Sequence, residues 1–236
     1  MDQLSTTDGT ILAFDIGGSK LKATVLSPTG EQLQEYIKTP TPNPCTPAAM
    51  IAALSGLAAN FEGFSRISVG FPGYVRNGVV KTAPNLGTEL WAGVNLTEQL
   101  SQALQKPVRM VNDADLQGLG VVSGEGLELV ITLGTGFGTA FLLDGRLLPH
   151  LEIGQHPLTK TKNYDQYVGD QAFLEIGEEH WNERMKKVLA ILSTTFNYDH
   201  LYIGGGNAKK LNFPLEQNMT LISNKAGIKG GARLWA

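Results

Sequence analysis

The sequence predicts an α/β fold built as two similar lobes with a central cleft. The chain has 236 residues, of which 42% are hydrophobic and 17% charged, a composition typical of folded globular proteins with enough apolar residues for two cores. Short apolar runs of strand length alternate with longer segments of helical periodicity. A pattern of strand, glycine-rich turn, strand, tight turn and strand occurs twice, as ILAFDIGGSKLKATVLSPTGEQL and as LELVITLGTGFGTAFLLDGRLL. This repeat indicates an internal duplication and therefore two related lobes.

The first half of the chain predicts mostly strands, with two helices between them. Strands are predicted over residues 11–16, 21–26, 33–38, 67–71, 79–81 and 108–111. Thr46 is the predicted N-cap of the first helix, because Pro47 then occupies the first helical position, where proline is favoured. Asn95 and Glu98 have the spacing of a capping box for the second helix, which we expect to reach Gln105.

The second half repeats the strand pattern and then turns helical. Strands are predicted over residues 127–133, 137–143, 146–148 and 201–203. A long helix with one buried stripe is predicted from apolar residues at helical spacing, namely Trp181, Met185, Val188, Leu189, Leu192 and Phe196. We expect the lobes to span residues 1–115 and 116–225, with a short helix over 226–236 that packs back on the first lobe.

Composition narrows the classes of function. The 19 Lys and Arg against 22 Asp and Glu give a net charge of −3 without a basic face, which argues against a nucleic-acid partner. A single cysteine, Cys45, excludes an internal disulfide and a Cys-rich zinc site. No apolar run reaches the roughly 18 residues of a membrane span, and residues 1–10 are too polar for a signal peptide. We therefore expect a cytoplasmic protein with no membrane partner.

Two glycine-rich turns are candidate phosphate-binding sites. In the first, Asp15 ends a strand before Gly17 and Gly18, whose missing side chains let backbone N–H groups approach an anion. The Asp15 carboxylate is suited to hold Mg²⁺ beside bound phosphates. An ordinary hairpin turn is the simpler interpretation of one Gly-Gly pair, but the second turn, at 134–138, weakens it. Neither turn matches the GxxxxGK[ST] of a P-loop, and the GxGxxG of dinucleotide folds is absent.

A third candidate follows the predicted strand over 108–111. An Asp at the position of Asp113 can be the general base for a hydroxyl nucleophile, but it can equally cap the following helix, and the residues alone leave both readings open. Asp115, one turn further, is expected to support the site or lie in solvent. The histidines show no metal-ligand spacing, and we expect three of the four to lie on the surface or in loops, the exception of interest being His156.

Taken together, these segments resemble the ROK family of sugar kinases, within the actin-like, ribonuclease H-like superfamily, and most closely its polyphosphate glucokinase branch. The resemblance covers nearly the whole chain, and the TPTP segment is what indicates the branch. Its parts, in order, are DIGGSKLK (15–22), TPTP (39–42), VGFPGYV (69–75), APNLG with Trp91 (83–91), VNDAD (111–115), LGTGFGTA (133–140), LEIG (151–154), YIGGGNAKK (202–210) and NKAGIKGGA (224–232).

The resemblance implies a two-lobed ribonuclease H-like kinase fold, Mg²⁺ as cofactor and a homodimer. It implies that Asp113 is the base acting on the 6-hydroxyl of the sugar, and that Asp15 holds the metal. The sugar-binding residues would be Asn85, Asn112, Glu152 and Gln155. The phosphate-binding residues would be Gly17, Gly18, Ser19 and Lys22 in one lobe, and Gly134, Thr135, Gly136 and Gly138 in the other. The adenosine of a nucleotide would rest on Gly204, Gly205 and Gly206.

The chain departs from the family pattern at one sugar-binding position. Family members usually read Glu-x-Gly-His, whereas here Gln155 stands in the fourth position and His156 follows it. Glutamine can hydrogen-bond a sugar hydroxyl but cannot become cationic. The expected function is phosphoryl transfer from polyphosphate, ATP or both to glucose. The alternatives are an ATP-dependent kinase for another hexose, such as mannose or an N-acetylhexosamine, and a non-catalytic sugar sensor.

Overall fold

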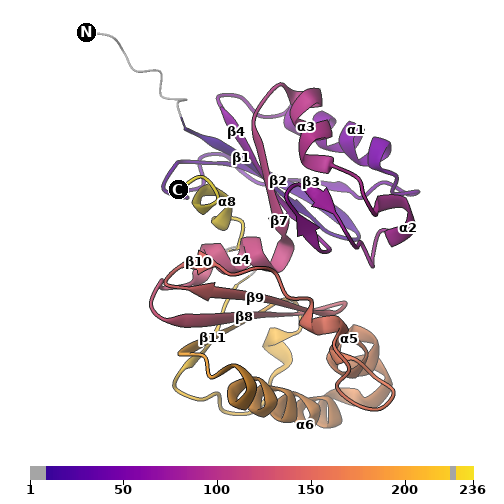
Figure 1. Ribbon diagram of the computed structural model, residues 1–236, viewed down its shortest axis with the longest axis vertical. Helices are drawn as coiled ribbons and strands as arrows, with labels where there is room; N and C mark the ends of the chain where they lie inside the picture. The colour runs from indigo at the N-terminus through magenta and orange to yellow at the C-terminus, as the bar shows by residue number, and fades with distance from the viewer. Residues whose placement is uncertain (1–8, 224–226) are drawn as a thin grey trace. The chain divides into compact units, whose positions relative to one another are not determined.

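The computed structural model describes residues 9–223 and 227–236 (Figure 1). These residues form two compact units, one running to Gly120 and including Ile228–Ala236, and the other lying within Val121–Gly227. The chain thus changes unit after Gly120, five residues beyond the expected end of the first lobe. The start of the expected C-terminal helix, at residue 226, lies outside the described residues, as do the first three residues of the NKAGIKGGA motif.

A five-stranded mixed sheet forms the centre of the first unit. Its strands are β1 (Ile11–Ile16), β2 (Lys20–Leu26), β3 (Ile37–Pro40), β4 (Arg66–Phe71) and β7 (Val108–Asn112), in the spatial order β3-β2-β1-β4-β7. Strands β1, β2 and β3 are antiparallel neighbours, while β1, β4 and β7 run parallel. The parallel strands therefore end at one edge of the sheet, where functional residues of open α/β sheets usually gather.

Helices cover both faces of this sheet. Alternate residues of β1 point to opposite faces of the sheet and belong to two different hydrophobic clusters. Leu12, Phe14 and Ile16 belong to the cluster under α1 (Pro47–Ala58) and α3 (Leu96–Leu104). Ile11 and Ala13 point the other way, toward α8 (Gly230–Arg233), which lies against β1 and β4 (Figure 1). The remaining elements of the unit are the hairpin β5 (Val75–Arg76) and β6 (Val79–Val80), and α2 (Thr88–Trp91).

The predicted helix caps are present. The Ala49 N–H donates to Oγ1 of Thr46 at 3.2 Å, with Pro47 in the first turn, and the Glu98 N–H donates to Oδ1 of Asn95 at 3.1 Å. Each cap satisfies one of the backbone donors that a helix start leaves unpaired. The position of both helices in the sequence is therefore set locally.

The second unit repeats the sheet of the first. Its strands are β8 (Leu127–Leu133), β9 (Phe137–Leu143), β10 (Arg146–Leu147), β11 (His200–Gly204) and β12 (Met219–Leu221), in the order β10-β9-β8-β11-β12. Strands β8, β9 and β10 are antiparallel, and β11 runs parallel to both β8 and β12. The two sheets thus share strand order and direction, as a duplicated hairpin unit would.

The long helix α6 (Asp170–Phe196) packs on the second sheet through the predicted stripe. Trp181, Met185, Val188, Leu189 and Leu192 are all buried in the cluster beneath it. Gly177, with φ of 76°, breaks the helical backbone near its start. The other helical elements of this unit are α5 (Tyr164–Val168) and the 3₁₀ turns η1 (Ile153–Gln155) and η2 (Ala208–Lys210). Helix α4 (Asp113–Val121) belongs to the first unit except for its last residue.

The prediction of a strand over 33–38 was wrong, because β3 covers Ile37–Pro40. Residues after the turn at Gly30, where φ is 87°, do not pair continuously with β2; the Gln34 carbonyl instead accepts a hydrogen bond from Oγ1 of Thr24. Leu33 is 51% exposed. Only residues 37–40 reach the register of β2, opposite Ala23 to Lys20.

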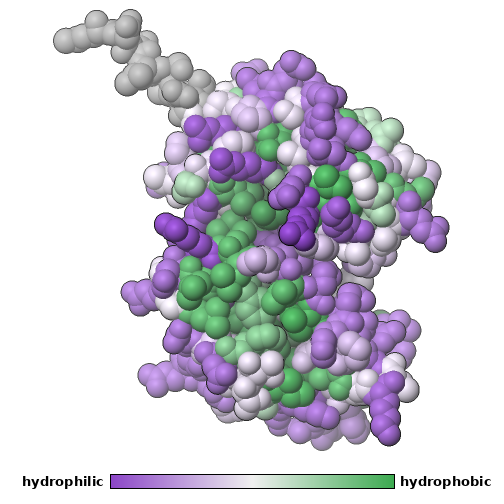
Figure 2. All heavy atoms as spheres, viewed as in Figure 1, coloured by the Kyte–Doolittle hydropathy of each residue, from purple (hydrophilic) through white to green (hydrophobic). Residues whose placement is uncertain are grey.

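The surface of the second unit carries exposed leucines that the sequence did not indicate as a group. Leu143, Leu148 and Leu151 are 46%, 37% and 46% exposed, and Figure 2 shows hydrophobic residues gathered over β9 and β10. Within residues 9–223 and 227–236, no helix is long and apolar enough to cross a membrane.

Candidate active site

The first glycine-rich turn joins β1 to β2 and is exposed. The Gly17 N–H donates to the Lys20 carbonyl at 3.0 Å, which closes the turn. A Cβ on Gly17 would lie 2.9 Å from that carbonyl, so the turn excludes larger residues there. The TPTP segment braces the same turn, because the Thr41 N–H donates to the Ser19 carbonyl at 3.0 Å and Oγ1 of Thr41 donates to the Gly17 carbonyl at 2.7 Å.

Asp15 and Lys22 face each other across β1 and β2. They are register partners, and Nζ of Lys22 lies 2.7 Å from Oδ2 of Asp15, with both side chains about one third exposed. The ion pair holds the carboxylate at the edge of the sheet beside the turn. The negative charge of Asp15 also reaches Tyr36, whose pKa is raised mainly by burial and further by this charge.

Asn112 and Asp113 lie where β7 passes into α4. Asn112 is buried, and its amide is engaged with the backbone: Nδ2 donates to the Gly73 carbonyl at 3.0 Å and Oδ1 accepts from the Ala114 N–H at 2.8 Å. Asp113 is exposed, and its Oδ1 also accepts from the Ala114 N–H, at 2.9 Å. Asn112 thus performs the capping that sequence alone allowed for Asp113.

The strand register places Asp15 and Asp113 at the same edge. Asp15 lies opposite Gly70, and Gly70 lies opposite Val111, two residues before Asp113. The two outer strands of this row are two interstrand spacings apart, about 10 Å. The strands that carry Asp15 and precede Asp113 are thus separated by the single strand β4. Asn85, an exposed loop residue, joins this group, since a Cβ on Gly18 would lie 3.6 Å from its Cβ.

The second glycine-rich turn joins β8 to β9 in the other unit. The Gly134 N–H donates to the Gly136 carbonyl at 3.2 Å, and the Asp170 N–H donates to the Gly134 carbonyl at 2.9 Å. The start of α6 therefore lies directly against this turn. Thr135 is exposed, and Gly138 follows in β9, opposite Thr132.

Asp165 is a site residue that sequence reasoning missed. Its Oδ1 accepts the Phe137 N–H at 2.6 Å, and its Oδ2 accepts from Nε2 of Gln155 at 2.6 Å, so one carboxylate joins the second turn to the LEIGQ segment. Burial raises the pKa of Asp165, and the nearby charge of Glu152 adds to the rise, while the two hydrogen bonds oppose it. The only sequence signal was the capping box that Asn163 and Gln166 form around it.

The predicted sugar-binding residues of this unit lie in that network. Oε1 of Glu152 lies 2.9 Å from Nε2 of His150, whose side chain is only 6% exposed. His150 lies in the loop after β10, one of the two expected locations, and its ring is packed beside Glu152. Gln155 also accepts a hydrogen bond from Nδ2 of Asn163, at 3.2 Å, while His156 is exposed and 6.4 Å from the ring of Tyr164.

The triple glycine, Gly204 to Gly206, lies against the end of β8, directly before the second turn. Gly205 has φ of 89°, and a Cβ there would collide with the Leu133 carbonyl at the end of β8. The Asn207 N–H donates to that carbonyl at 2.9 Å, and Nδ2 of Asn207 donates to Oδ1 of Asp170 at 2.6 Å. Gly206 has open space where a side chain would be. This edge of the second sheet can therefore accept a flat or anionic group close to the backbone.

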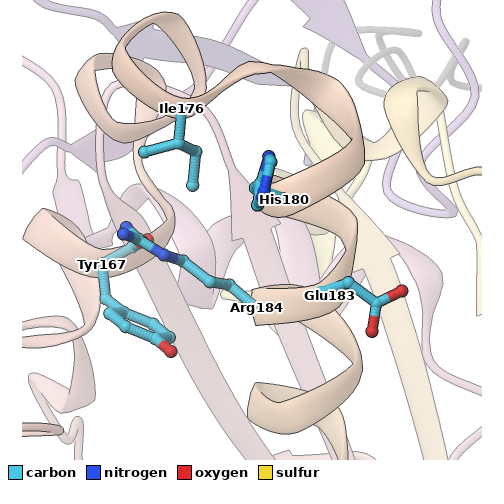
Figure 3. Close-up of a pocket in the computed structure, with 5 residues that line it drawn as sticks. All are labelled: Tyr167, Ile176, His180, Glu183 and Arg184. Carbon is cyan, nitrogen blue, oxygen red and sulfur yellow. The ribbon is translucent and has the colours of Figure 1, made fainter.

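A separate cavity of about 520 Å³ lies between α5 and α6 and contains none of the predicted residues. It is lined by Tyr167, Ile176, His180, Glu183 and Arg184 (Figure 3). Figure 3 shows Arg184 extending toward Tyr167, and its Nη1 donates to the Tyr167 carbonyl at 3.0 Å while its guanidinium lies 4.5 Å from the ring centroid. The Arg184 guanidinium at this cavity is thus held by Tyr167.

The chain is similar to known proteins over most of its length. Residues 11–156 match the sequence profile of the ROK family. A polyphosphate glucokinase of Mycobacterium leprae (strain TN) is 31% identical over 236 residues, covering 93% of this chain and 72% of the relative. One of Mycobacterium tuberculosis (strain CDC 1551 / Oshkosh) is 30% identical over 249 residues, covering 97% and 92%. The inorganic polyphosphate/ATP-glucomannokinase of Arthrobacter sp. strain KM superposes with a TM-score of 0.85 at 29% identity, covering 95% of this chain and 97% of the other.

The chain therefore belongs to the ROK family, and its fold is the actin-like, ribonuclease H-like fold of that family's sugar kinases. The predicted α/β class and the resemblance are confirmed.

Proposed function

We propose that this phosphotransferase of the ROK family transfers a phosphoryl group from polyphosphate or ATP to the 6-hydroxyl of glucose. The observation that carries the proposal is the edge of the first sheet, where Asp15 lies near the end of β1 and Asp113 directly follows β7, with only β4 between these two strands. The names of the relatives, polyphosphate glucokinase and polyphosphate/ATP-glucomannokinase, support the donor and the acceptor.

In this reaction Asp113 is the general base. The Ala114 N–H orients one oxygen of its carboxylate, and the exposed position at the end of β7 gives a hydroxyl access to the other. The acceptor oxygen forms a bond to phosphorus while the bond from phosphorus to the donor's bridging oxygen breaks, and the hydroxyl proton passes to Asp113. A base acts here because the alcohol must lose its proton as it attacks.

The glycine turns bind the donor in this proposal. Their backbone N–H groups stabilise negative charge on the transferring group without a side chain in the way. Asp15 fits a Mg²⁺ ion of the kind that phosphate substrates bring, which is held by one or two carboxylates and otherwise by water and phosphate oxygens. Within the described residues no three His, Cys, Asp or Glu side chains form a metal cluster. The ion, when bound, neutralises charge on the phosphates.

The residues proposed to bind the sugar are Asn85, Glu152 and Gln155. The network around Asp165 fixes the direction of the Gln155 amide, because both its oxygen and its nitrogen are hydrogen-bonded. Asn112 supports the site mainly by holding the backbone between β4 and α4.

Glucose 6-phosphate formation with Mg²⁺, using polyphosphate and ATP in parallel, tests the proposal. We expect product with polyphosphate, and none when the sugar is omitted. Product with ATP but not with polyphosphate would support glucose as the acceptor and contradict polyphosphate as the donor. Sugar binding by calorimetry without product from either donor would instead favour the sensor.

Replacing Gln155 by His is expected to tighten glucose binding. Histidine is the residue that family members usually carry at this position. Its imidazole would lie beside the Asp165 carboxylate, and this negative charge favours the protonated imidazole. One improved hydrogen bond corresponds to roughly a 2- to 10-fold lower KM for glucose. Steady-state kinetics at varied glucose would measure it, with His156→Gln as the neighbouring control. An unchanged KM would show that residue 155 does not contact the sugar.

Mannose is the second candidate acceptor, because the Arthrobacter neighbour is named for both sugars. A homodimer stays a prediction from the resemblance, and light scattering of the purified chain would measure it.

A further inference from the structure

Three lysines lie on one face of the β2–β3 ladder, next to the first glycine-rich turn. Lys22 of β2 is directly opposite Lys38 of β3, and Lys20 is directly opposite Pro40. Lys20 and Lys22 are two residues apart in one strand and so share a face with Lys38. The alternate residues of β2, Leu21 and Ala23, point the other way and pack with Ile37 in the core.

This basic face is electrostatically unbalanced. Only Lys22 has a carboxylate partner, Asp15; no ion pair in the described part of the chain involves Lys20 or Lys38, and both are exposed. Like charges directly opposite each other on neighbouring strands destabilise a sheet. An arrangement that costs stability locally is typical of a functional surface. A bound anion would supply the negative charge that these lysines lack.

The face is continuous with the turn proposed to bind phosphate. Ser19 precedes Lys20 directly, and the Thr41 N–H ties the end of β3 to the Ser19 carbonyl at 3.0 Å. The ammonium groups therefore extend from the turn across two strands, in steps of about 5 Å between strands and about 7 Å along one strand. An anion held by them must be long and repeatedly charged.

We propose that Lys20 and Lys38, beside Lys22, bind the segment of a polyphosphate chain that continues beyond the phosphates in the glycine turns. The inference rests on the proposed function and adds a surface that distinguishes donors. ATP ends in a nucleoside after three phosphates, so it has no charge left for Lys38. A long polyphosphate gains contacts with each further lysine and releases counter-ions, as other polyanions do.

The test compares the Lys20→Gln/Lys38→Gln variant with the wild type on long-chain polyphosphate, on tetrapolyphosphate and on ATP. Glutamine keeps the length of the stem and removes the charge. We expect kcat/KM for the long chain to fall about tenfold relative to kcat/KM for ATP, which corresponds to losing two charge-assisted contacts. The dependence of the long-chain KM on salt should also become shallower.

The matched control is Arg146→Gln/Lys187→Gln, which changes the net charge equally at two exposed residues of the other unit. It should leave the ratio of long-chain to ATP kcat/KM unchanged. Equal losses with all three donors would overturn the inference, because the lysines would then act on transfer itself. An unchanged ratio in the Lys20 and Lys38 variant would also overturn it.

Calorimetric binding of long-chain polyphosphate without sugar separates this inference from the proposed function. If the wild type binds the chain more tightly than the variant but forms no sugar phosphate, the role of the basic face is supported and the proposed reaction is overturned. If the wild type transfers phosphate from polyphosphate but binds it no better than the variant, the proposed reaction is supported and the role of the basic face is overturned. A wild type that neither binds nor transfers overturns both.

Discussion

Replacing Asp113 by Asn is expected to lower kcat for glucose phosphorylation by about 10²–10⁴-fold, the contribution typical of a positioned general base. Asparagine keeps an oxygen that can accept the Ala114 N–H, so the start of α4 is preserved. Asp113 is exposed, and the free energy of unfolding should change by no more than about 0.5 kcal/mol. Initial rates at saturating donor and sugar, together with thermal unfolding, measure both quantities.

The matched control for this variant is Asp144→Asn. Asp144 is an exposed turn residue with φ of 49°, a conformation that asparagine also tolerates, and it lies at the end of β9 away from the second glycine turn. Its kcat should equal that of the wild type. A kcat within threefold of the wild type for Asp113→Asn would contradict the base role, and an unfolded variant would show that Asp113 is needed for the fold.

The largest expected loss of stability follows from replacing Glu128 by Ala. Glu128 lies in β8 with none of its surface exposed, and its carboxylate accepts the Ser123 and Gly124 N–H groups at 2.7 and 2.8 Å and the Tyr202 hydroxyl at 3.0 Å. The variant leaves these donors without their acceptor and creates a cavity, so we expect a loss of about 3 kcal/mol or more. Chemical denaturation at pH 7 measures it.

The pH dependence of this loss identifies the charge as its cause. Burial alone would raise the pKa of Glu128, but the hydrogen bonds from Gly124, Ser123 and Tyr202 outweigh it and the pKa lies below its usual value. A lowered pKa in the folded state stabilises the protein above the unfolded-state value, about 4.3, and that contribution is lost as the pH falls through the folded-state pKa. The stability gap between wild type and variant should therefore be constant above about pH 5.5 and shrink in acid.

Tyr202→Phe is the graded control. It removes one of the donors and keeps the ring, so it should cost about 1 kcal/mol. In the double variant with Glu128→Ala, the two losses should not add, because both act on the same hydrogen bond. Full additivity would show that the carboxylate acts independently of Tyr202.

Much of the local structure could be predicted from periodicity and capping. The strands β8 and β9 were predicted with their observed ends, and Thr46 and Asn95 cap the helices assigned to them. These features depend on neighbours within a few residues, which a sequence shows directly. The failure at β3 has the same explanation: its start depends on the register of β2, which is a contact between distant residues.

The candidate site divides in the same way. The glycine turns and Asp113 could be named because backbone access and a carboxylate after a strand are local signals. Asp165 could not be named, because its role comes from accepting the Phe137 N–H, 28 residues earlier, and the amide of Gln155. The packing of His150 beside Glu152 also depends on what surrounds both side chains.

By itself, the sequence determined the α/β class, the duplicated hairpins and the family, because hydrophobic periodicity and the glycines that the turns require can be read directly from it. Only the tertiary structure decided which charges meet. The register of β1, β2 and β3 pairs Lys22 with Asp15 while leaving Lys20 and Lys38 exposed, and the fold buries Glu128 against Ser123, Gly124 and Tyr202. The physical reason is that electrostatic and hydrogen-bond energies depend on distance and burial, which strand pairing sets between residues far apart in the chain.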